Sequence, residues 1–361
     1  METASLVPLL PPDNSTAPPA APAASSGRTQ DTLHILFAVI FCATFLLGTA
    51  GNGLVIWVSG FRMPRSVNGI WYLHLAVADF TFCLFLPLAV AQAALGFHWP
   101  FGRLLCKLYN SLGGLNLFTS VFLLTLISAD RCICILRPVW AHSHRSPGRA
   151  TLASAGAWLL ALALTVPQFI FRDTAREGRH VHCYNNFDPW NETHGDERLR
   201  RELVKTRSVA VVVTRLVLGF ALPLVTIGAC YGLVLFELGR KGKLLGTSRP
   251  LRVLAAVVLA FFLCWLPVHV ASALQLVAVV RGSRALFATV RILGPLGVCL
   301  TCVNSCLNPV LYAFLGRDFR EHLLHSLPAA LERALAEESD QTPLTGSRSG
   351  AGPPQLETCR L

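Results

Sequence analysis

Polar side chains set inside long apolar stretches are the residues of this chain that could do chemistry. Asp79 is the clearest, because it lies mid-way along the apolar stretch that contains LHLAVADF and has no basic neighbour there. An ionisable group in an apolar interior costs at least a few kcal/mol, so it needs a partner or a function. We expect a buried hydrogen-bonded cluster made of Asp79 and the polar residues at comparable depth in other stretches: Asn52, Ser120, Asn304, Ser305 and Asn308.

The cluster has two interpretations. Oxygen atoms are the ligands that hard cations prefer, so Asp79, Ser120, Asn304 and Asn308 could hold a small cation such as sodium. Alternatively, Asp79 is protonated and simply hydrogen-bonded to its neighbours. Apart from this sodium ion, the sequence suggests no cofactor.

Seven long apolar stretches must position these residues. Of the 361 residues 53% are hydrophobic and only 14% are charged, whereas soluble domains have about a quarter of their residues charged. A helix of about 20 residues crosses a hydrocarbon core of roughly 30 Å, whereas barrel strands would alternate polar and apolar residues. We therefore predict an all-α membrane protein, a seven-transmembrane helix bundle with spans near 34–60, 67–96, 106–136, 150–171, 208–238, 253–280 and 285–315.

Basic residues between the spans predict the orientation. The loops after spans one, three and five contain Arg62, Arg145 and Lys241 among other Lys and Arg residues, and almost no acid. Such loops face the cytoplasm, which places the N-terminus outside and the C-terminus inside, as in a multi-pass plasma-membrane protein. The net charge of +11 then reflects membrane topology, and we expect no nucleic-acid partner.

The ends of the chain differ in composition from the bundle at 33–316. Residues 1–32 are rich in Pro, Ala and Ser and read as a disordered extracellular tail. Residues 317–336 have an apolar face and predict a short interfacial eighth helix on the cytoplasmic face, in contact with membrane lipids. Residues 337–361 read as a disordered cytoplasmic tail with candidate phosphorylation sites at Ser339, Thr342 and Thr345. The predicted outer segments contain two glycosylation sequons, at Asn14 and Asn191.

Cysteine positions support this topology. Of twelve cysteines, only Cys106 at the outer start of span three and Cys183 in the loop after span four lie at the oxidising face. Disulfides persist in oxidising compartments. We expect these two to pair.

Six short motifs occur in order, each in its own span. They are Gly51-Asn52, LxxAxAD ending at Asp79, Asp130-Arg131-Cys132, Trp158, CWLP from Cys264 to Pro267, and NPVLY from Asn308 to Tyr312. Together they resemble the motifs of rhodopsin-like G-protein-coupled receptors.

The resemblance implies roles for the matching residues. Arg131 would engage the G protein, and Asp130 would hold it at rest by a charge-assisted bond. Tyr231 and Tyr312 would turn inward in the active form, while Phe261 and Trp265 would repack beneath the ligand. Asn308 and Pro309 belong to the same signalling set.

Longer segments resemble the chemoattractant branch of that family. GNGLVIWVSGFRMP, DRCICILRPVWAHSHR and GRDFREHLLHSLPAALERALAEES look like formyl-peptide receptors, whereas FTSVFLLTLIS and CYNNF look like the chemerin receptor. FRDT also occurs in the prostaglandin D2 chemoattractant receptor. The resemblance implies coupling to an inhibitory-type G protein. The Ser and Thr residues that follow the acidic run Glu337-Glu338 in the tail predict a target for receptor kinases and thereby for arrestin.

The ligand pocket departs from formyl-peptide receptors. An Asp in span three of those receptors corresponds to Gly114, and the outer of two Arg in span five corresponds to Val211, while Arg215 matches the inner one. Arg215, with Arg291 and His269, predicts an electropositive cavity for an extracellular peptide or an acidic lipid. Alternatively, Arg215 reaches water or pairs internally.

Other classes fit less well. A transporter usually has internal repeats or charges in several spans. A retinal pump needs a Lys in span seven, but no Lys follows Lys243. An enzyme would need catalytic residues, and GxSxG, HExxH and paired aspartates at mid-membrane depth are absent. An arrestin-biased or scavenger receptor of the same fold remains as the alternative.

Overall fold

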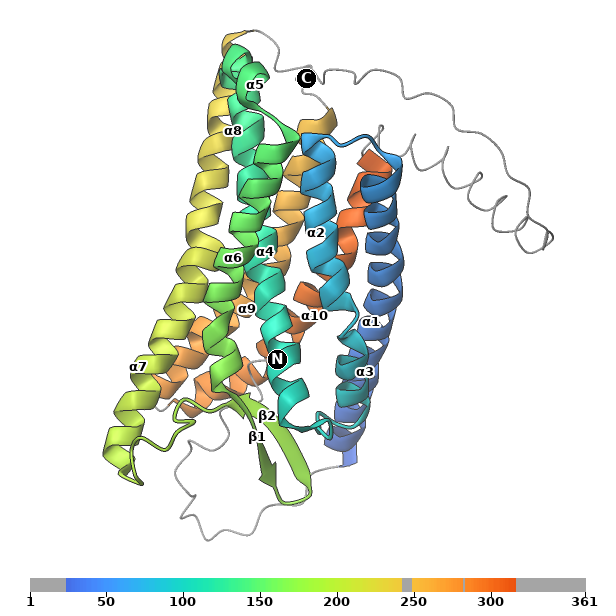
Figure 1. Ribbon diagram of the computed structural model, residues 1–361. Helices are drawn as coiled ribbons and strands as arrows, with labels where there is room; N and C mark the ends of the chain where they lie inside the picture. Colours follow the sequence, from blue (N-terminus) through green and yellow to red (C-terminus); the bar gives the residue numbers. More distant parts are fainter. Residues whose placement is uncertain (1–23, 242–248, 282, 316–361) are drawn as a thin grey trace, which may run out of the picture.

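The computed structural model describes residues 24–241, 249–281 and 283–315, which form a bundle of long helices with one β-hairpin (Figure 1). The predicted seven-span, all-α membrane fold is confirmed for this part of the chain. The predicted interfacial helix at 317–336 and the tail at 337–361 lie outside the described residues. Seven helical stretches are long and apolar enough to cross a membrane: Thr32–Arg62, Val67–Ala94, Gly102–Leu136, Pro147–Phe171, Glu197–Arg240, Leu254–Ala278 and Ile292–Leu311.

Four spans are a single α-helix, the first ends in a π-helical turn at Val58–Arg62, and the second and fifth are each built from two α-helices. The second span joins α2 to α3, and the fifth joins α7 to α8 through a π-helical turn at Val217–Ala221. The helices are α1 Ala24–Trp57, α2 Val67–Cys83, α3 Leu86–Ala94, α4 Gly102–Leu136, α5 Pro138–His144, α6 Pro147–Phe171, α7 Glu197–Leu216, α8 Leu222–Arg240, α9 Arg249–Arg281 and α10 Arg284–Leu315.

Capping side chains fix where several helices begin. Ser66 accepts a hydrogen bond from the amide of Gly69 at the start of α2. Asp196 accepts bonds from the amides of Arg198 and Leu199 at 2.8 and 3.1 Å at the start of α7. Both use the N-cap preference of short polar side chains. The α7 helix therefore begins at Glu197, well before the predicted start of this span at 208. The prediction missed its first turns because they are polar and carry no apolar signal.

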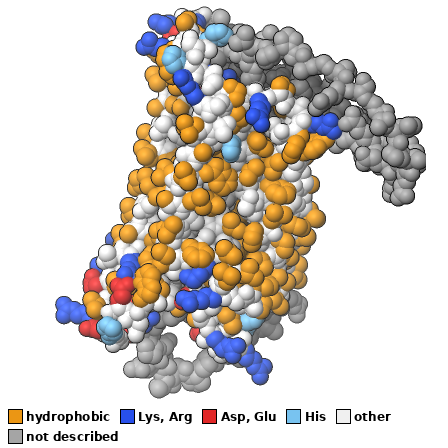
Figure 2. All heavy atoms as spheres, viewed as in Figure 1, with side chains coloured by type: hydrophobic (Ala, Val, Ile, Leu, Met, Phe, Trp, Pro, Cys, Tyr) orange, Lys and Arg blue, Asp and Glu red, His pale blue; other side chains and the backbone are white. Residues whose placement is uncertain are grey.

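The helix α4 is central to the bundle and packs against α2, α6 and α8, while α10 packs against α9 and α1. Figure 2 shows hydrophobic side chains along the middle of the viewed face and many Lys and Arg side chains toward the two ends, the distribution expected of a membrane-spanning bundle. The largest buried cluster is apolar and includes Val55, Leu75, Leu117, Leu124, Ile127 and Phe261.

One feature was not expected from the sequence: an antiparallel hairpin of β1 (Arg172–Glu177) and β2 (His180–Asn185). The strands pair from Arg172↔Asn185 to Glu177↔His180, which leaves a two-residue turn whose first residue, Gly178, has φ of +59°. A positive φ there is typical of tight hairpin turns. We call this end of the bundle the hairpin end and the opposite one, where α5 lies, the α5 end (Figure 1).

Candidate functional site

Asp79 lies in a fully buried polar network that joins four spans. Its side chain has no exposed surface. One carboxylate oxygen accepts a hydrogen bond from Asn116 of α4 at 2.8 Å, and the other accepts one from Asn308 of α10 at 2.7 Å. The side-chain amide of Asn52, on α1, donates to the backbone carbonyl of Ser305 on α10 at 2.7 Å. The carboxyl group therefore has hydrogen-bond donors on both sides, as a buried polar group requires.

The structure places the other predicted members of this cluster differently. Ser120 and Asn304 are 2% and 1% exposed, but among the described residues neither donates a hydrogen bond to Asp79. Asn116 takes that role instead. The signal for Asn116 was an amide in an otherwise apolar span, the same signal that singled out Asn52 and Asn308.

A row of aromatic side chains runs along the inner face of α9. The rings of Phe261 and Trp265 lie 5.8 Å apart, and those of Trp265 and His269 lie 6.3 Å apart. Phe220, from the π-helical turn, reaches His269 at 4.9 Å and Phe262 at 5.1 Å. All three predicted α9 residues, Phe261, Trp265 and His269, are at least nine-tenths buried. A change at His269 can therefore pass to Trp265 and Phe261 by direct ring contact.

Gly114 lies against a polar partner that the sequence analysis missed. A Cβ at Gly114 would stand 1.9 Å from Oε1 of Gln168, far inside contact distance. Gln168, on α6, is 8% exposed, and its Oε1 has no hydrogen-bond partner among the described residues. The carboxamide thus fills the space that a side chain at Gly114 would need. A polar residue directly after Pro167 in an apolar span was the available signal.

The remaining predicted pocket residues are only partly located. Val211 and Arg215 lie half-buried on α7. Arg215 and His269 each interact with other parts of the protein. The Arg291 position belongs to α10, but its side chain lies outside the described residues. The structure therefore does not test whether Arg215, His269 and Arg291 line one cavity.

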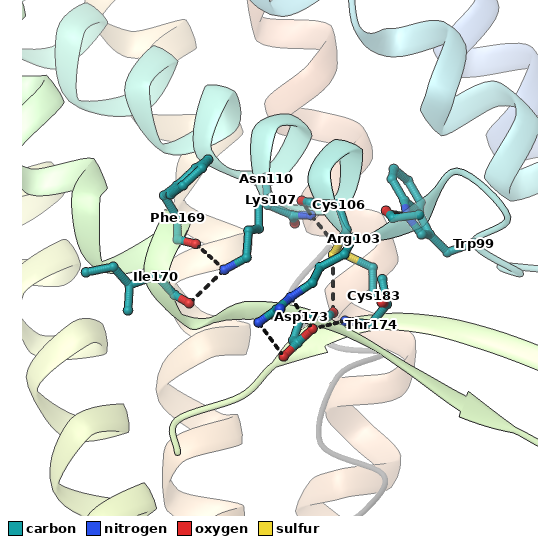
Figure 3. The surroundings of a disulfide bond; sticks show 11 residues. Trp99, Arg103, Cys106, Lys107, Asn110, Phe169, Ile170, Asp173, Thr174 and Cys183 are labelled. Atoms are coloured by element: carbon teal, nitrogen blue, oxygen red, sulfur yellow. Dashed lines mark hydrogen bonds and ion pairs between the residues drawn. A yellow bond between two sulfur atoms is a disulfide. The ribbon is translucent and has the colours of Figure 1, made fainter. Parts of the chain in front are cut away.

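At the hairpin end, the structure joins the two cysteines that the sequence analysis paired. Cys106 of α4 and Cys183 of β2 form a disulfide with their Cα atoms 5.8 Å apart (Figure 3). Asn110, one turn along α4, donates to the Cys183 sulfur at 3.2 Å. Lys107 donates to two carbonyls in the last turn of α6, at 2.7 and 2.9 Å (Figure 3). A cation at a helix C-terminus satisfies otherwise unpaired carbonyls and complements the helix dipole.

Further contacts attach the hairpin to the start of α4 and to the loop before it. Arg103 forms an ion pair with Asp173 at 2.8 Å (Figure 3). The Trp99 amide donates to the Val181 carbonyl at 2.8 Å, and the Val181 amide donates to Nδ1 of His98 at 2.9 Å. With the disulfide, these contacts fix both strands beside α4.

The loop between β2 and α7 contains the predicted sequon at Asn191. Asn191 is exposed and has a φ of +53°, whereas Thr193 is 3% exposed and donates to Asp188 at 2.7 Å. The pKa of Asp188 is lowered mainly by this bond and, to a smaller extent, by bonds from the backbone amides of Glu192 and Thr193. Glu192 also pairs with Arg207 at 2.8 Å. The other sequon, at Asn14, lies outside the described residues.

At the α5 end, Asp130 and Arg131 do not pair with one another, contrary to our expectation. Arg145 donates to both oxygens of Asp130, at 2.9 and 3.2 Å, and to the Asn68 side-chain oxygen at 2.7 Å. Arg131 donates to the same Asn68 oxygen. The reason for the difference is geometric, since the guanidinium fork of Arg145 matches the carboxylate with two bonds.

The other predicted signalling residues lie at several depths. Tyr231 is half-buried and packs against a cluster that includes Cys132 and Leu251. Pro309 lies against Gly51, where an added Cβ would stand 3.0 Å from the proline ring. The side chain of Tyr312, and all of Ser339, Thr342 and Thr345, lie outside the described residues.

Comparison with known proteins agrees with this architecture. The family model for the 7 transmembrane receptor (rhodopsin family) matches residues 51–312. Formyl peptide receptor 2 of Mus musculus is 44% identical over 330 residues, 90% of this chain and 92% of that protein. N-formyl peptide receptor 2 of Homo sapiens is 45% identical over 338 residues, 92% and 94% of the two chains. The human fMet-Leu-Phe receptor is 43% identical over 330 residues, 91% and 92% of the two chains.

The fold, the buried polar network and these matches define a seven-transmembrane receptor of the rhodopsin family, to which the chain belongs. Within that family it is similar to formyl peptide receptors along nearly its whole length. Proteins of this family are receptors, and the chain is accordingly a multi-pass membrane protein and not an enzyme.

Proposed function

We propose that this protein is a chemoattractant-type receptor of the plasma membrane that activates inhibitory-type G proteins in inflammatory or immune signalling. The observation that carries the proposal is the identity of 43–45%, across at least 90% of the chain, to receptors named for formyl peptides. The basic loops at the α5 end support an orientation in which this end and the C-terminus face the cytoplasm.

The ligand is proposed to be an extracellular peptide or an acidic lipid that binds near the hairpin end. Arg215 supports an acidic group on the ligand, because a partly buried guanidinium forms strong charge-assisted bonds with carboxylates. Arg291 and His269 would add to the same positive field. Gly114 and Val211 leave two positions without a charge, and the carboxamide of Gln168 occupies the space beside Gly114. These differences favour a ligand other than the formylated peptides of the relatives.

A sodium ion is proposed at the Asp79 network. Besides the Asp79 carboxylate, two buried oxygens there, of Ser120 and Asn308, have no hydrogen-bond partner among the described residues. Hard cations take oxygen ligands of this kind. With Asn304 nearby on α10, the residue types fit such an ion, which would balance the buried carboxylate charge.

The cytoplasmic partners are proposed from the α5 end and the tail. Arg131 is half-buried at the inner end of α4 and would be the contact for the G protein. Phosphorylation at Ser339, Thr342 and Thr345 by receptor kinases would recruit arrestin through added negative charge. The segment 317–336 would lie on membrane lipids.

A ligand screen in transfected cells tests this function. Formylated peptides, chemerin-like peptides and lipid acids would be applied, and inhibition of cyclic AMP and recruitment of arrestin would both be read. We expect at least one acidic ligand to lower cyclic AMP. Arrestin recruitment with unchanged cyclic AMP, and no response from any other G-protein class, would instead support an arrestin-biased or scavenger receptor.

A further inference from the structure

Arg145, in the turn between α5 and α6, is placed to control the state of Arg131. It donates two bonds to the carboxylate of Asp130, at 2.9 and 3.2 Å. The two side chains are only 12% and 14% exposed. At this burial the pair is poorly screened by solvent or salt, unlike an ion pair on an open surface.

Arg131 has a weaker anchor. It is bound to the neutral side-chain oxygen of Asn68, and it shares this oxygen with Arg145. Arg145 binds a carboxylate with two bonds, which is the stronger and more specific arrangement, whereas Arg131 binds an uncharged oxygen. Two cations therefore compete for one carboxylate, and Arg145 holds it.

We propose that Arg145 is a positioning residue for signalling, which keeps Asp130 occupied and so leaves Arg131 on Asn68, from where it is easily released to a G protein. The inference rests on the proposed function, since it takes Arg131 as the G-protein contact. Without Arg145, the half-buried Asp130 carboxylate would have lost its partner, and the adjacent Arg131, which shares the Asn68 oxygen with Arg145, is placed to replace it. Arg131 would then be held more firmly and signalling would fall.

A nearby arginine provides a matched control. Arg149, in the first turn of α6, also carries a guanidinium, but it donates to the backbone carbonyl of His144 at 2.8 Å and, among the described residues, forms no hydrogen bond with Asp130. Replacing Arg149 by Gln removes the same charge from this end of the bundle without freeing the carboxylate.

The test is ligand-free nucleotide exchange in membranes that contain the full-length receptor, normalised to surface expression, with each of the four classes of G protein. We expect Arg145→Gln to lower basal exchange about tenfold, the size of effect expected from a redirected charged hydrogen bond. Arg145→Lys should recover part of the loss and Arg149→Gln should be unchanged. In an Asp130→Asn background, Arg145→Gln should have no further effect, because no carboxylate remains to capture Arg131.

Equal losses from Arg145→Gln in both backgrounds would overturn the proposal, because they would show a merely structural role. Exchange on a class other than the inhibitory type would correct the proposed function and leave the Arg145 comparison intact. If the unmodified receptor drives no exchange on any class, either without ligand or with the ligands of the screen, the proposed function fails, and melting temperatures of the purified variants decide the pairing. Additive shifts for Asp130→Asn and Arg145→Gln would then contradict it.

Discussion

The space beside Gly114 is occupied by a side chain from another helix, and this has consequences for both stability and recognition. The Gln168 carboxamide enters from α6 and lies 1.9 Å from where a Cβ would be. Its oxygen is buried without a partner among the described residues. A buried acceptor left in this way costs free energy until a donor reaches it. The pair therefore combines tight packing with an unused polar group in the part of the bundle where we propose that the ligand binds.

We expect Gly114→Ala to be less stable than Gly113→Ala by about 1 kcal/mol, the lower end of the cost of overpacking, because the buried Gln168 carboxamide must turn away from the new methyl group. The measurement is the melting temperature of the purified receptor. Gly113→Ala is the matched control, because a Cβ there would meet only the Phe82 ring at an ordinary 3.7 Å. Gln168→Ala should restore the stability of Gly114→Ala. Equal tolerance of Ala at positions 113 and 114 would contradict the packing argument.

The charge of Arg215 gives a second prediction at this scale. Arg215→Ala should weaken an acidic ligand by about tenfold or more, as loss of a charged hydrogen bond predicts. Binding of the acidic ligand identified by the screen would be compared with binding of its neutral amide or ester. Equal losses for the two would show that Arg215 does not recognise the carboxylate.

Among the elements, the loop between β2 and α7 is organised by one carboxylate. Asp188 accepts bonds from the Glu192 amide at 2.8 Å and the Thr193 hydroxyl at 2.7 Å. These bonds favour the ionised form, so they lower the pKa of Asp188. A few residues later, Asp196 caps the N-terminus of α7. Two short acidic side chains thus define the loop and the helix start that follows it.

This loop should loosen in acid. Because the pKa of Asp188 is lowered by folding, its stabilisation is fully present above the ordinary value of about 3.9 and is lost as the pH falls through the lowered value. Hydrogen exchange of the Glu192 amide, corrected for intrinsic rates, should therefore lose protection below about pH 4. Asp188→Ala should lack this protection at neutral pH as well. Protection that is independent of pH in the unmodified protein would disprove the role of Asp188.

Across the whole molecule, separate groups of polar and aromatic contacts join the helices at several levels between the two ends. Asp79 ties α2 to α4 and α10, and the aromatic rings of α9 extend from His269 to Phe261. At the α5 end, Asn68 of α2 meets Arg131 of α4. Such a bundle can favour one of two packings when a ligand binds at one end.

We expect Arg131→Ala to abolish G-protein activation and leave ligand binding largely intact, because Arg131 lies at the α5 end and the proposed ligand site lies near the hairpin. Nucleotide exchange and binding of the ligand from the screen would be measured on the same membranes. Arg137→Ala is a control for loss of a positive charge at this end, because Arg137 directly follows α4 but is exposed. Unchanged exchange in Arg131→Ala would remove Arg131 from the mechanism.

The sequence predicted the spans well because membrane insertion depends on length and apolar composition, both of which are local. It also placed Asp79 and Asn308 in one cluster, because buried polar groups must find one another. It missed the Arg145–Asp130 pair and the Gln168–Gly114 contact, since both depend on how separate segments of the chain are placed relative to one another. The hairpin was missed because its strands are short and follow a helix without a strong alternating pattern.

The firm attachment of the hairpin has a consequence for kinetics. The disulfide to Cys106, the Arg103–Asp173 ion pair and the Trp99–Val181 bond hold both strands against the start of α4. Displacing the hairpin would break the ion pair and the hydrogen bond while the disulfide still tethers it, so a ligand that had to wait for this movement would associate slowly. We therefore expect the fast route to pass beside the hairpin, with an association rate in the ordinary range of about 10⁵–10⁷ M⁻¹s⁻¹. For an acidic ligand this rate should fall as ionic strength rises.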